Sequence, residues 1–251
     1  MLLPTILPGP LRPHPPSLFH GAHSSLVQQR HRPQREPLPP FDMKTLLLVG
    51  ATGLVGQSVL TQALADSRFA RVVAPTRRPL PSQPKLENPL VAFDALPVDA
   101  PWWASDAAIC TLGTTIKKAG SQPAFRLVDH DYSLAVATLA RRHGTAAFAL
   151  VSSVGADAAA RTFYLRTKGE TERDLTALNF PSLTILRPSF IGGDRAERRP
   201  GEAFALRFFS VLTWLIPRRY RIVPSGRIAQ KLLADALAAA PGIRVVESES
   251  I

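Results

Sequence analysis

Short apolar runs alternate with segments of helical periodicity along the chain from Lys44 onward. The apolar runs predict strands over Thr45–Val49, Arg71–Ala74, Leu90–Phe93, Ala107–Leu112, Ala147–Val151 and Leu183–Leu186. Apolar positions three and four residues apart predict helices over Leu54–Ala65, Arg126–Arg142 and Thr167–Leu178. Because the strands are apolar on both faces and alternate with helices, we expect a doubly wound, mostly parallel α/β sheet with a small C-terminal substrate or lid region.

Residues 1–42 follow a different pattern, because prolines recur throughout them and no helical or strand period is present. This composition predicts a disordered, proline-rich leader over 1–42, in front of one domain over 43–251. Two explanations of the leader stay open. Translation starts at Met43 and the leader is an upstream extension, or the leader is a targeting or interaction tail.

The composition is that of a globular protein with a sizeable core, since 45% of the 251 residues are hydrophobic. The formal net charge is +11, but the positive residues are scattered and no nucleic-acid motif accompanies them. We therefore expect a small-molecule substrate and no nucleic-acid partner. An apolar run of about 18 residues is absent from the sequence, which predicts no integral membrane association.

Cys110 is the single cysteine, and its place inside an apolar run predicts a buried thiol rather than a nucleophile. One cysteine forms neither an internal disulfide nor a thiolate metal cluster, and we expect no metal site. This cysteine usage is typical of a reducing compartment and predicts a cytoplasmic location.

The segment after the first predicted strand has a glycine at every third position, Gly50, Gly53 and Gly56. A strand, a glycine turn and a helix in this order are typical of a dinucleotide-binding βαβ unit. Gly50 would allow the tight reversal, Gly53 would let backbone N–H groups approach a pyrophosphate, and Gly56 would let the helix pack on the strand. An ordinary turn between a strand and a helix is the alternative.

Two arginines, Arg77 and Arg78, follow the second predicted strand, and no carboxylate occurs between Arg71 and Leu80. A carboxylate here would accept hydrogen bonds from the ribose 2′-hydroxyl of NAD, whereas a guanidinium group suits the 2′-phosphate of NADP. The pair therefore favours NADP(H) as the cofactor, with two solvated surface arginines as the alternative.

Asp94 follows the third predicted strand, where its carboxylate would accept a hydrogen bond from the adenine amino group or cap a turn. Leu112 and Gly113 follow the fourth strand. The glycine would let the backbone pass close to the adenosine ribose and the pyrophosphate, or it serves only a turn.

Ser152 and Ser153 follow the fifth predicted strand, and Tyr164 and Lys168 lie further along at a spacing that places both on one helix face. A phenol is a poor base at neutral pH, but a nearby ammonium favours the phenolate and lowers the pKa of the tyrosine. The lysine would also bind the nicotinamide ribose, and a serine hydroxyl would hold a substrate carbonyl or alcohol. These residues predict proton transfer coupled to hydride transfer.

These motifs together resemble the atypical and extended short-chain dehydrogenase/reductases, and within them the Tat-interacting-protein oxidoreductase-like group. The resemblance covers about residues 46–209. Beyond the glycine turn, it rests on Arg77-Arg78, Cys110–Thr115, Lys118–Gly120, Val128-Asp129, Asp131-Tyr132, Ser152-Ser153, Gly155–Asp157, Tyr164-Leu165, Lys168–Glu170, Arg187-Pro188 and Arg199–Glu202.

The resemblance implies an NAD(P)-binding Rossmann domain that binds NADPH, with Tyr164 as the proton acceptor. Lys168 and either Ser152 or Ser153 would assist the tyrosine. The further cofactor contacts that the resemblance implies are Thr52, Gly53, Leu54, Val55, Arg77, Arg78, Leu112, Gly113, Ile191 and Arg199. By the same analogy, the helices that flank the sheet would pair in a homodimer, and a monomer is the alternative that stays open.

Two functions are consistent with these residues. The first is an NADPH-dependent oxidoreductase that acts on a small carbonyl or alcohol. The second is a non-catalytic, NADPH-binding regulatory or scaffold protein. The phenol beside an ammonium favours the first, because a binding module needs no such pair.

Overall fold

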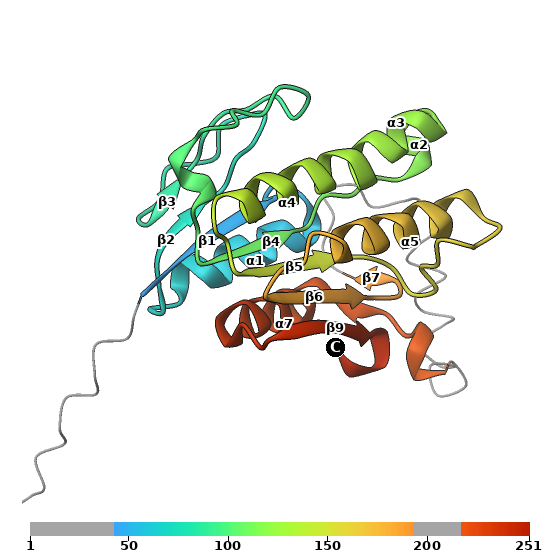
Figure 1. Cartoon of the computed structure of the whole chain (residues 1–251). Coiled ribbons are helices and arrows are strands. Elements are labelled where there is room, and N and C mark those ends of the chain that lie inside the picture. Colours follow the sequence, from blue (N-terminus) through green and yellow to red (C-terminus); the bar gives the residue numbers. More distant parts are fainter. Residues whose placement is uncertain (1–42, 193–216) are drawn as a thin grey trace, which may run out of the picture. The chain divides into compact units, whose positions relative to one another are not determined.

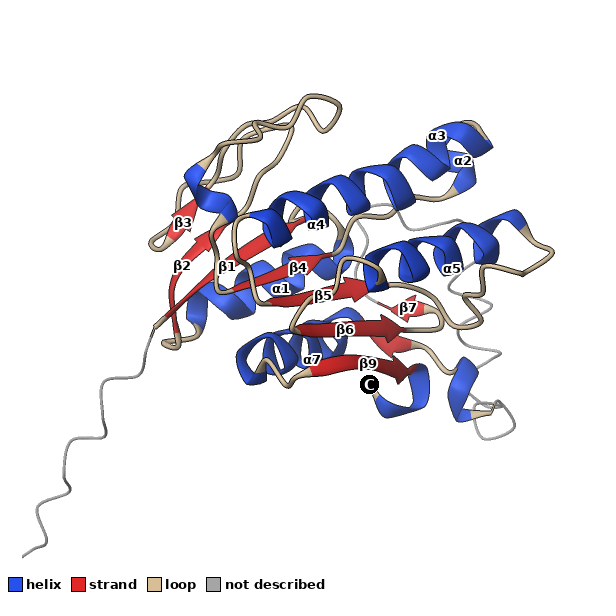
Figure 2. Cartoon of the chain, viewed as in Figure 1, coloured by secondary structure: helices blue, strands red, loops and turns tan. Residues whose placement is uncertain are grey.

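The structure is a computed structural model, and it describes residues 43–192 and 217–251. Within these ranges, parallel strands form one seven-stranded sheet. The strand order is β3-β2-β1-β4-β5-β6-β9, and every pair is parallel (Figure 2). The strands are β1 (Lys44–Val49), β2 (Phe69–Val73), β3 (Leu86–Glu87), β4 (Ala107–Cys110), β5 (Ala147–Val151), β6 (Ser182–Arg187) and β9 (Gly242–Glu247). A separate parallel pair joins β7 (Ile191–Gly192) to β8 (Val223–Pro224).

Helices cover both faces of the sheet (Figure 1). Helix α1 (Leu54–Ala65) packs against α7 (Ser225–Ala238) on one face, and α4 (Tyr132–Arg142) lies beside α5 (Phe163–Thr176) on the other. The shorter helices are α2 (Ile116–Ala119), α3 (Gln122–Arg126), the π-helical η2 (Leu127–Asp131), and the 3₁₀ turns η1 (Pro101–Trp103), η3 (Arg218–Tyr220) and η4 (Ser248–Ser250).

Strand β1 shows why the sheet is buried on both faces. Leu46 and Leu48 belong to the apolar cluster under α1 and α7, whereas Leu47 and Val49 belong to the cluster under α4 and η1. All four side chains are fully buried. The continuous apolar runs in the sequence therefore predict the doubly wound, mostly parallel fold correctly.

The predicted strand at Leu90–Phe93 is wrong. The third strand is β3, only two residues long, and Leu90 makes an isolated bridge to Thr76 instead. Leu90 is exposed at this end of the sheet. Its apolar neighbours Val91 and Phe93 pack on the α4 side of the core without forming a strand.

Two elements of the sheet's C-terminal side, α7 and β9, have no counterpart in the sequence prediction. Helix α7 carries a buried face that includes Ile228 and Leu232, and it completes the layer with α1. Strand β9 pairs with β6 along six residues, but four of its residues are exposed, so its apolar pattern is weak. The leader and the polar stretch 194–201 lie outside the described residues.

Helix α1 packs directly on the glycine turn. A Cβ on Gly56 would lie 2.7 Å from the carbonyl carbon of Gly50 and 2.9 Å from the Cα of Ala51, both backbone atoms. Backbone cannot move aside as a flexible side chain can, so any larger residue would push the helix away from β1.

We expect Gly56→Ala to lower the free energy of unfolding by about 1–3 kcal/mol, because the added methyl group overlaps the backbone. The matched control is Gly226→Ala in α7, where the nearest atom to a Cβ is the Gln62 Nε2 at 3.8 Å. The control should melt at or above the wild-type temperature, since alanine favours a helix. Thermal unfolding measures both variants, and equal melting temperatures would contradict the packing argument.

Candidate functional site

The glycine turn follows β1 and lies against the loop after β4. Gly50 has φ +89°, and a Cβ there would be 2.6 Å from the Oγ1 of Thr111. The backbone N–H and the hydroxyl of Thr111 both donate to the carbonyl of Val49, at 2.8 and 3.0 Å. Only glycine suits Gly50, because both the backbone conformation and the space exclude a side chain.

The start of α1 is open. Gly53 is the N-cap, and its N–H donates to the Gly50 carbonyl at 2.9 Å. Thr52 and Gly53 are exposed, Leu54 is half-buried and Val55 is buried. Among the described residues, no side chain caps this helix, and its first turn holds no acidic residue. The backbone donors and the partial positive charge of the helix start are thus suited to an anion.

The loop after β4 approaches α5 at Gly113. A Cβ on this exposed glycine would be 3.8 Å from the Nζ of Lys168 and 3.5 Å from the Oδ1 of Asp129. Leu112 is half-buried and packs against the α4 side of the core. The structure therefore brings the glycine turn, Gly113 and Lys168 together at the carboxyl ends of β1 and β4, where ligands bind in sheets of this type.

Lys168 forms a buried ion pair that the sequence analysis does not predict. Its Nζ lies 2.7 Å from the Oδ1 of Asp129, and the two side chains are only 7% and 1% exposed. The Oδ2 of Asp129 accepts a hydrogen bond of 2.8 Å from the backbone N–H of Thr114. Burial alone would lower the pKa of Lys168, but the charge of Asp129, with a smaller contribution from Tyr164, raises it above its usual value.

Tyr164 lies one helical turn before Lys168, in the first turn of α5. It is 36% exposed, and its ring centroid is 5.5 Å from that of the buried Phe125 in α3. The aromatic contact holds the ring on the α3 side and leaves part of the tyrosine open to solvent. This exposure is suited to a group that meets a substrate.

The structure separates the two candidate serines. Ser152 is buried and its hydroxyl donates to the Oε1 of Glu172. Ser153 is half-buried, and its hydroxyl makes only a long contact of 3.5 Å with the carbonyl of Val154. Ser153 is therefore the serine whose hydroxyl is the more available to a ligand.

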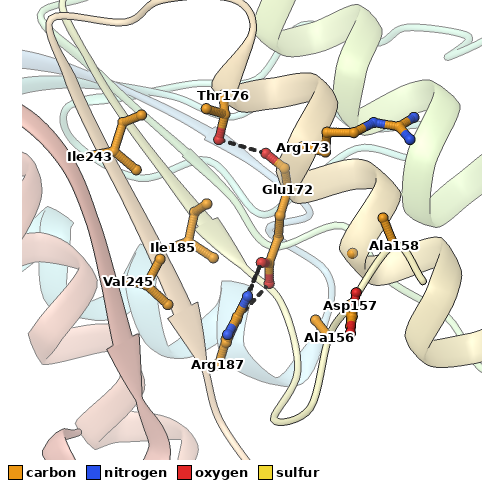
Figure 3. A pocket seen from close by; sticks show the side chains of 11 residues that line it. Ala156, Asp157, Ala158, Glu172, Arg173, Thr176, Ile185, Arg187, Ile243 and Val245 are labelled. Carbon is orange, nitrogen blue, oxygen red and sulfur yellow. Dashed lines mark hydrogen bonds and ion pairs between the residues drawn. The ribbon is translucent and has the colours of Figure 1, made fainter. Parts of the chain in front are cut away.

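Glu172 is the centre of a charged network at the carboxyl ends of β6 and β9. Arg187 donates to both oxygens of Glu172, at 3.0 and 3.2 Å from Nε, and its Nη1 donates to Glu247 at 3.0 Å. The hydrogen bonds to Glu172 raise the pKa of Arg187. A hollow of about 470 Å³ lies beside this network, and Ile243 and Val245 of β9 line its far side (Figure 3). None of the predicted cofactor or catalytic residues lines this hollow.

The arginine pair lies on a supported loop after β2. Arg77 and Arg78 are exposed, and neither guanidinium group has an ion-pair or hydrogen-bond partner within the described ranges. Asn88 stabilises the loop, because its Nδ2 donates to the Oγ1 of Thr76 at 2.8 Å and its Oδ1 accepts from the N–H of Leu80. Two guanidinium groups without partners among the described residues, on a loop fixed by hydrogen bonds, are suited to bind a phosphate.

The remaining predicted contacts are Asp94, Ile191 and Arg199. Asp94 is exposed and lines a hollow of about 500 Å³ with Phe93 and Leu134. Ile191 is half-buried in β7. Arg199 lies outside the described residues.

Two residues that sequence reasoning missed are Asp129 and Asn88. Asp129 is one of the residues that carry the family resemblance, but no role was predicted for it. An aspartate on the buried face of a predicted amphipathic helix is a signal that could have indicated a charged partner, because a buried carboxylate needs one. Asn88 gives no signal, because its contacts depend on how the loop after β2 folds back.

The prediction of a buried Cys110 is confirmed, and burial raises the pKa of this thiol. Among the described residues, no three histidine, cysteine, aspartate or glutamate side chains are grouped so that they could hold a metal ion.

The chain is similar in sequence to proteins of mammals and fungi. Over 174 residues it is 38% identical to protein HTATIP2 of Rattus norvegicus, an alignment that covers 67% of this chain and 72% of the rat protein. It is 38% identical over 177 residues to the protein "fmp52, mitochondrial" of Emericella nidulans, which covers 67% of this chain and 75% of the fungal protein. No protein-family model matches the chain.

The solved structure of MoeE5 in complex with UDP-glucose and NAD has the same fold. It superposes with a TM-score of 0.62 at 18% sequence identity, and covers 80% of this chain and 74% of that one.

The predicted cytoplasmic location is contradicted by the fungal relatives, which are named mitochondrial. The reason is that a single cysteine indicates only a reducing environment and does not distinguish one such compartment from another. No helix within residues 43–192 or 217–251 has the length and apolar character needed to span a bilayer.

The identity to the rat protein extends over 67% of this chain and 72% of that protein. The chain belongs to the HTATIP2 group of the atypical short-chain dehydrogenase/reductases, a family of oxidoreductase-like Rossmann proteins.

Proposed function

We propose that this protein is an NADPH-dependent oxidoreductase that transfers hydride to or from a small carbonyl or alcohol, with Tyr164 as the proton donor or acceptor. The observation that carries the proposal is the meeting of three elements at one place. Gly113 lies beside the Lys168 ammonium, Tyr164 precedes that lysine by one turn, and the open start of α1 lies across the adjoining loop.

The glycine turn fits a dinucleotide. Gly53 is exposed, and among the described residues a Cβ there would meet only the Gly50 carbonyl, at 3.3 Å, with no side chain within 4 Å. Backbone N–H groups of Leu54 and Val55 at the helix start would donate to a pyrophosphate. Thr52 would lie on the solvent side of the same phosphates.

The adenosine end would lie between the loops after β2 and β4. Arg77 and Arg78 would form charge-assisted hydrogen bonds with a 2′-phosphate, since neither has another partner within the described ranges. Leu112 and Gly113 would flank the adenosine ribose. The NAD in the MoeE5 complex lacks this phosphate, so the arginine pair supports a cofactor choice that the fold likeness alone does not give.

A nicotinamide cofactor bound here would supply the hydride chemistry, as donor for reduction of a carbonyl and as acceptor for oxidation of an alcohol. Tyr164 gives its phenolic proton to the carbonyl oxygen, so that the product is a neutral alcohol. Lys168, held charged by Asp129, binds the ribose hydroxyls and stabilises the phenolate that forms. Ser153 donates a hydrogen bond to the substrate oxygen.

One observation favours the alternative of an NADPH-binding protein without turnover. The hydroxyl of Ser152 is buried and already donates to Glu172, so one of the two candidate serines is not free for a substrate. Tight NADPH binding without oxidation by any member of a carbonyl panel would support this alternative.

We expect Tyr164→Phe to lower kcat/KM by about 10²- to 10⁴-fold, because the variant keeps the ring and loses the proton. The dissociation constant for NADPH should stay unchanged, since the ring still packs on Phe125. Steady-state kinetics and fluorescence titration measure the two quantities. Tyr132→Phe is the matched control and should keep full activity. Wild-type turnover in the Tyr164 variant would refute the assigned role.

We expect the double variant Arg77→Ala/Arg78→Ala to weaken NADPH binding by about 10- to 100-fold, the effect of losing charged hydrogen bonds to a phosphate. NADH binding should not change, because NADH has no 2′-phosphate. Isothermal titration calorimetry measures both cofactors. The variant Arg141→Ala/Arg142→Ala, at the far end of α4, removes the same charge and serves as the control. A parallel loss for NADPH and NADH would overturn the assignment.

A further inference from the structure

A π-helical turn interrupts the long helix that runs from α3 into α4. The turn η2 spans Leu127–Asp131, and two consecutive residues in it, Asp129 and His130, are both buried. Successive residues of a regular α-helix point about 100° apart, so a wider turn helps to aim both side chains inward. Turns of this type are frequent at functional sites.

Both buried side chains of η2 bind α5. Asp129 pairs with Lys168, and the Nε2 of His130 lies 2.9 Å from the Oδ2 of Asp174. Arg126, just before the turn, also forms an ion pair with Glu170. Through these side chains, the π-helical turn and the residue before it are attached to α5 at three points along that helix.

Asp129 has a second attachment, to the loop after β4. One carboxylate oxygen meets the Lys168 ammonium at 2.7 Å, and the other accepts the Thr114 N–H at 2.8 Å. The loop therefore stays next to α5 through a single carboxylate. The ionisable groups that face Lys168 are Asp129 from η2, Tyr164 from its own helix and Cys110 from β4.

We propose that Asp129 is the positioning residue of the active site, which holds the Lys168 ammonium in place and joins it to the cofactor loop at Thr114. This inference rests on the proposed oxidoreductase function. Asp129 itself touches neither cofactor nor substrate in this assignment and acts through the lysine.

The physical basis is the cost of a buried charge. An unpaired ammonium in an apolar site is costly and tends to lose its proton, whereas one held by a carboxylate stays charged and oriented. Lys168 is thereby ready to bind the ribose before the ligand arrives, which reduces the reorganisation that binding requires.

The variant that tests this role is Asp129→Asn, which keeps the shape and an oxygen to accept the Thr114 N–H but removes the charge. Burial of Lys168 is then unopposed, so the pKa of Lys168 should fall by about 1–3 pH units. The ¹³Cε shift of labelled lysine measures it, and a Lys168→Met spectrum identifies the signal among the six lysines of the chain.

The activity should follow the same titration. In the wild type the pKa of Lys168 is raised, so the ammonium and the activity that depends on it persist as pH rises. In Asp129→Asn the ammonium is lost as pH rises through the lowered pKa, and kcat should fall at least about tenfold across that range. If Asp129 only supported the fold, its replacement would lower activity at every pH and would add no new fall of activity (a new basic limb of the pH profile) as pH rises.

Asp131→Asn is the matched control, because this exposed carboxylate lies in the same π-helical turn and pairs with His130 instead. It should leave both the lysine titration and the pH profile unchanged. If Asp129→Asn does not fold, as circular dichroism would reveal, Asp129→Glu takes its place, because it keeps the charge and moves the carboxylate by one methylene group. The lysine should then titrate near the wild-type pH, while kcat is lower than in the wild type.

Two results would overturn the proposal: a Lys168 signal that titrates as in the wild type, or a lowered titration with no new limb in the pH profile. Failure of the proposed function looks different, because the wild type would then show no turnover. In that case the pH dependence of NADPH affinity replaces the rate, and Asp129→Asn should lose affinity as pH rises. An affinity that stays level with pH, or no NADPH binding by the wild type, would also overturn the proposal.

Discussion

The buried ion pair between Lys168 and Asp129 is the contact on which the candidate site depends. Each partner would be costly to bury alone, so each fixes the place of the other. The pair joins α5, which carries Tyr164, to the loop after β4, which carries Gly113. Without it, Tyr164 and the loop after β4 would be held only by separate elements of the fold.

The parallel sheet provides the frame for that pair. The carboxyl ends of β1, β4 and β5 lie at one edge, so three loops that are distant in sequence meet there. Gly50 allows the first of these loops to lie close to the loop after β4, and Gly56 allows α1 to pack on the turn, because a Cβ at either position would overlap backbone atoms. The Glu172–Arg187–Glu247 network ties the ends of β6 and β9 to α5 on the other side.

Elements with strong local patterns could be predicted from the sequence. Helix α1 and strand β5 have the predicted bounds, because an apolar run or a regular period determines them. Strand β9 could not be predicted, since its exposed residues give little pattern and only its pairing with β6 makes it a strand. In the site, the spacing of Tyr164 and Lys168 is a local feature, whereas the partner of Lys168 comes from a different helix. Likewise, two adjacent serines look equivalent in sequence, and only the position of Glu172 distinguishes them.

The π-helical turn also restricts how this stretch of chain can change in length. Such a turn accommodates one more residue than a regular helix would need over the same rise. Deleting one residue there would leave a regular helix, in which successive side chains point about 100° apart. Asp129 and His130 could then not both face α5 unless the apolar side of α4, including Val136 and Ala140, turned out of the core. Homologous chains that keep the ion pair should therefore keep the spacing from Ser121 to Arg142 free of insertions and deletions, even where the side chains between these positions differ.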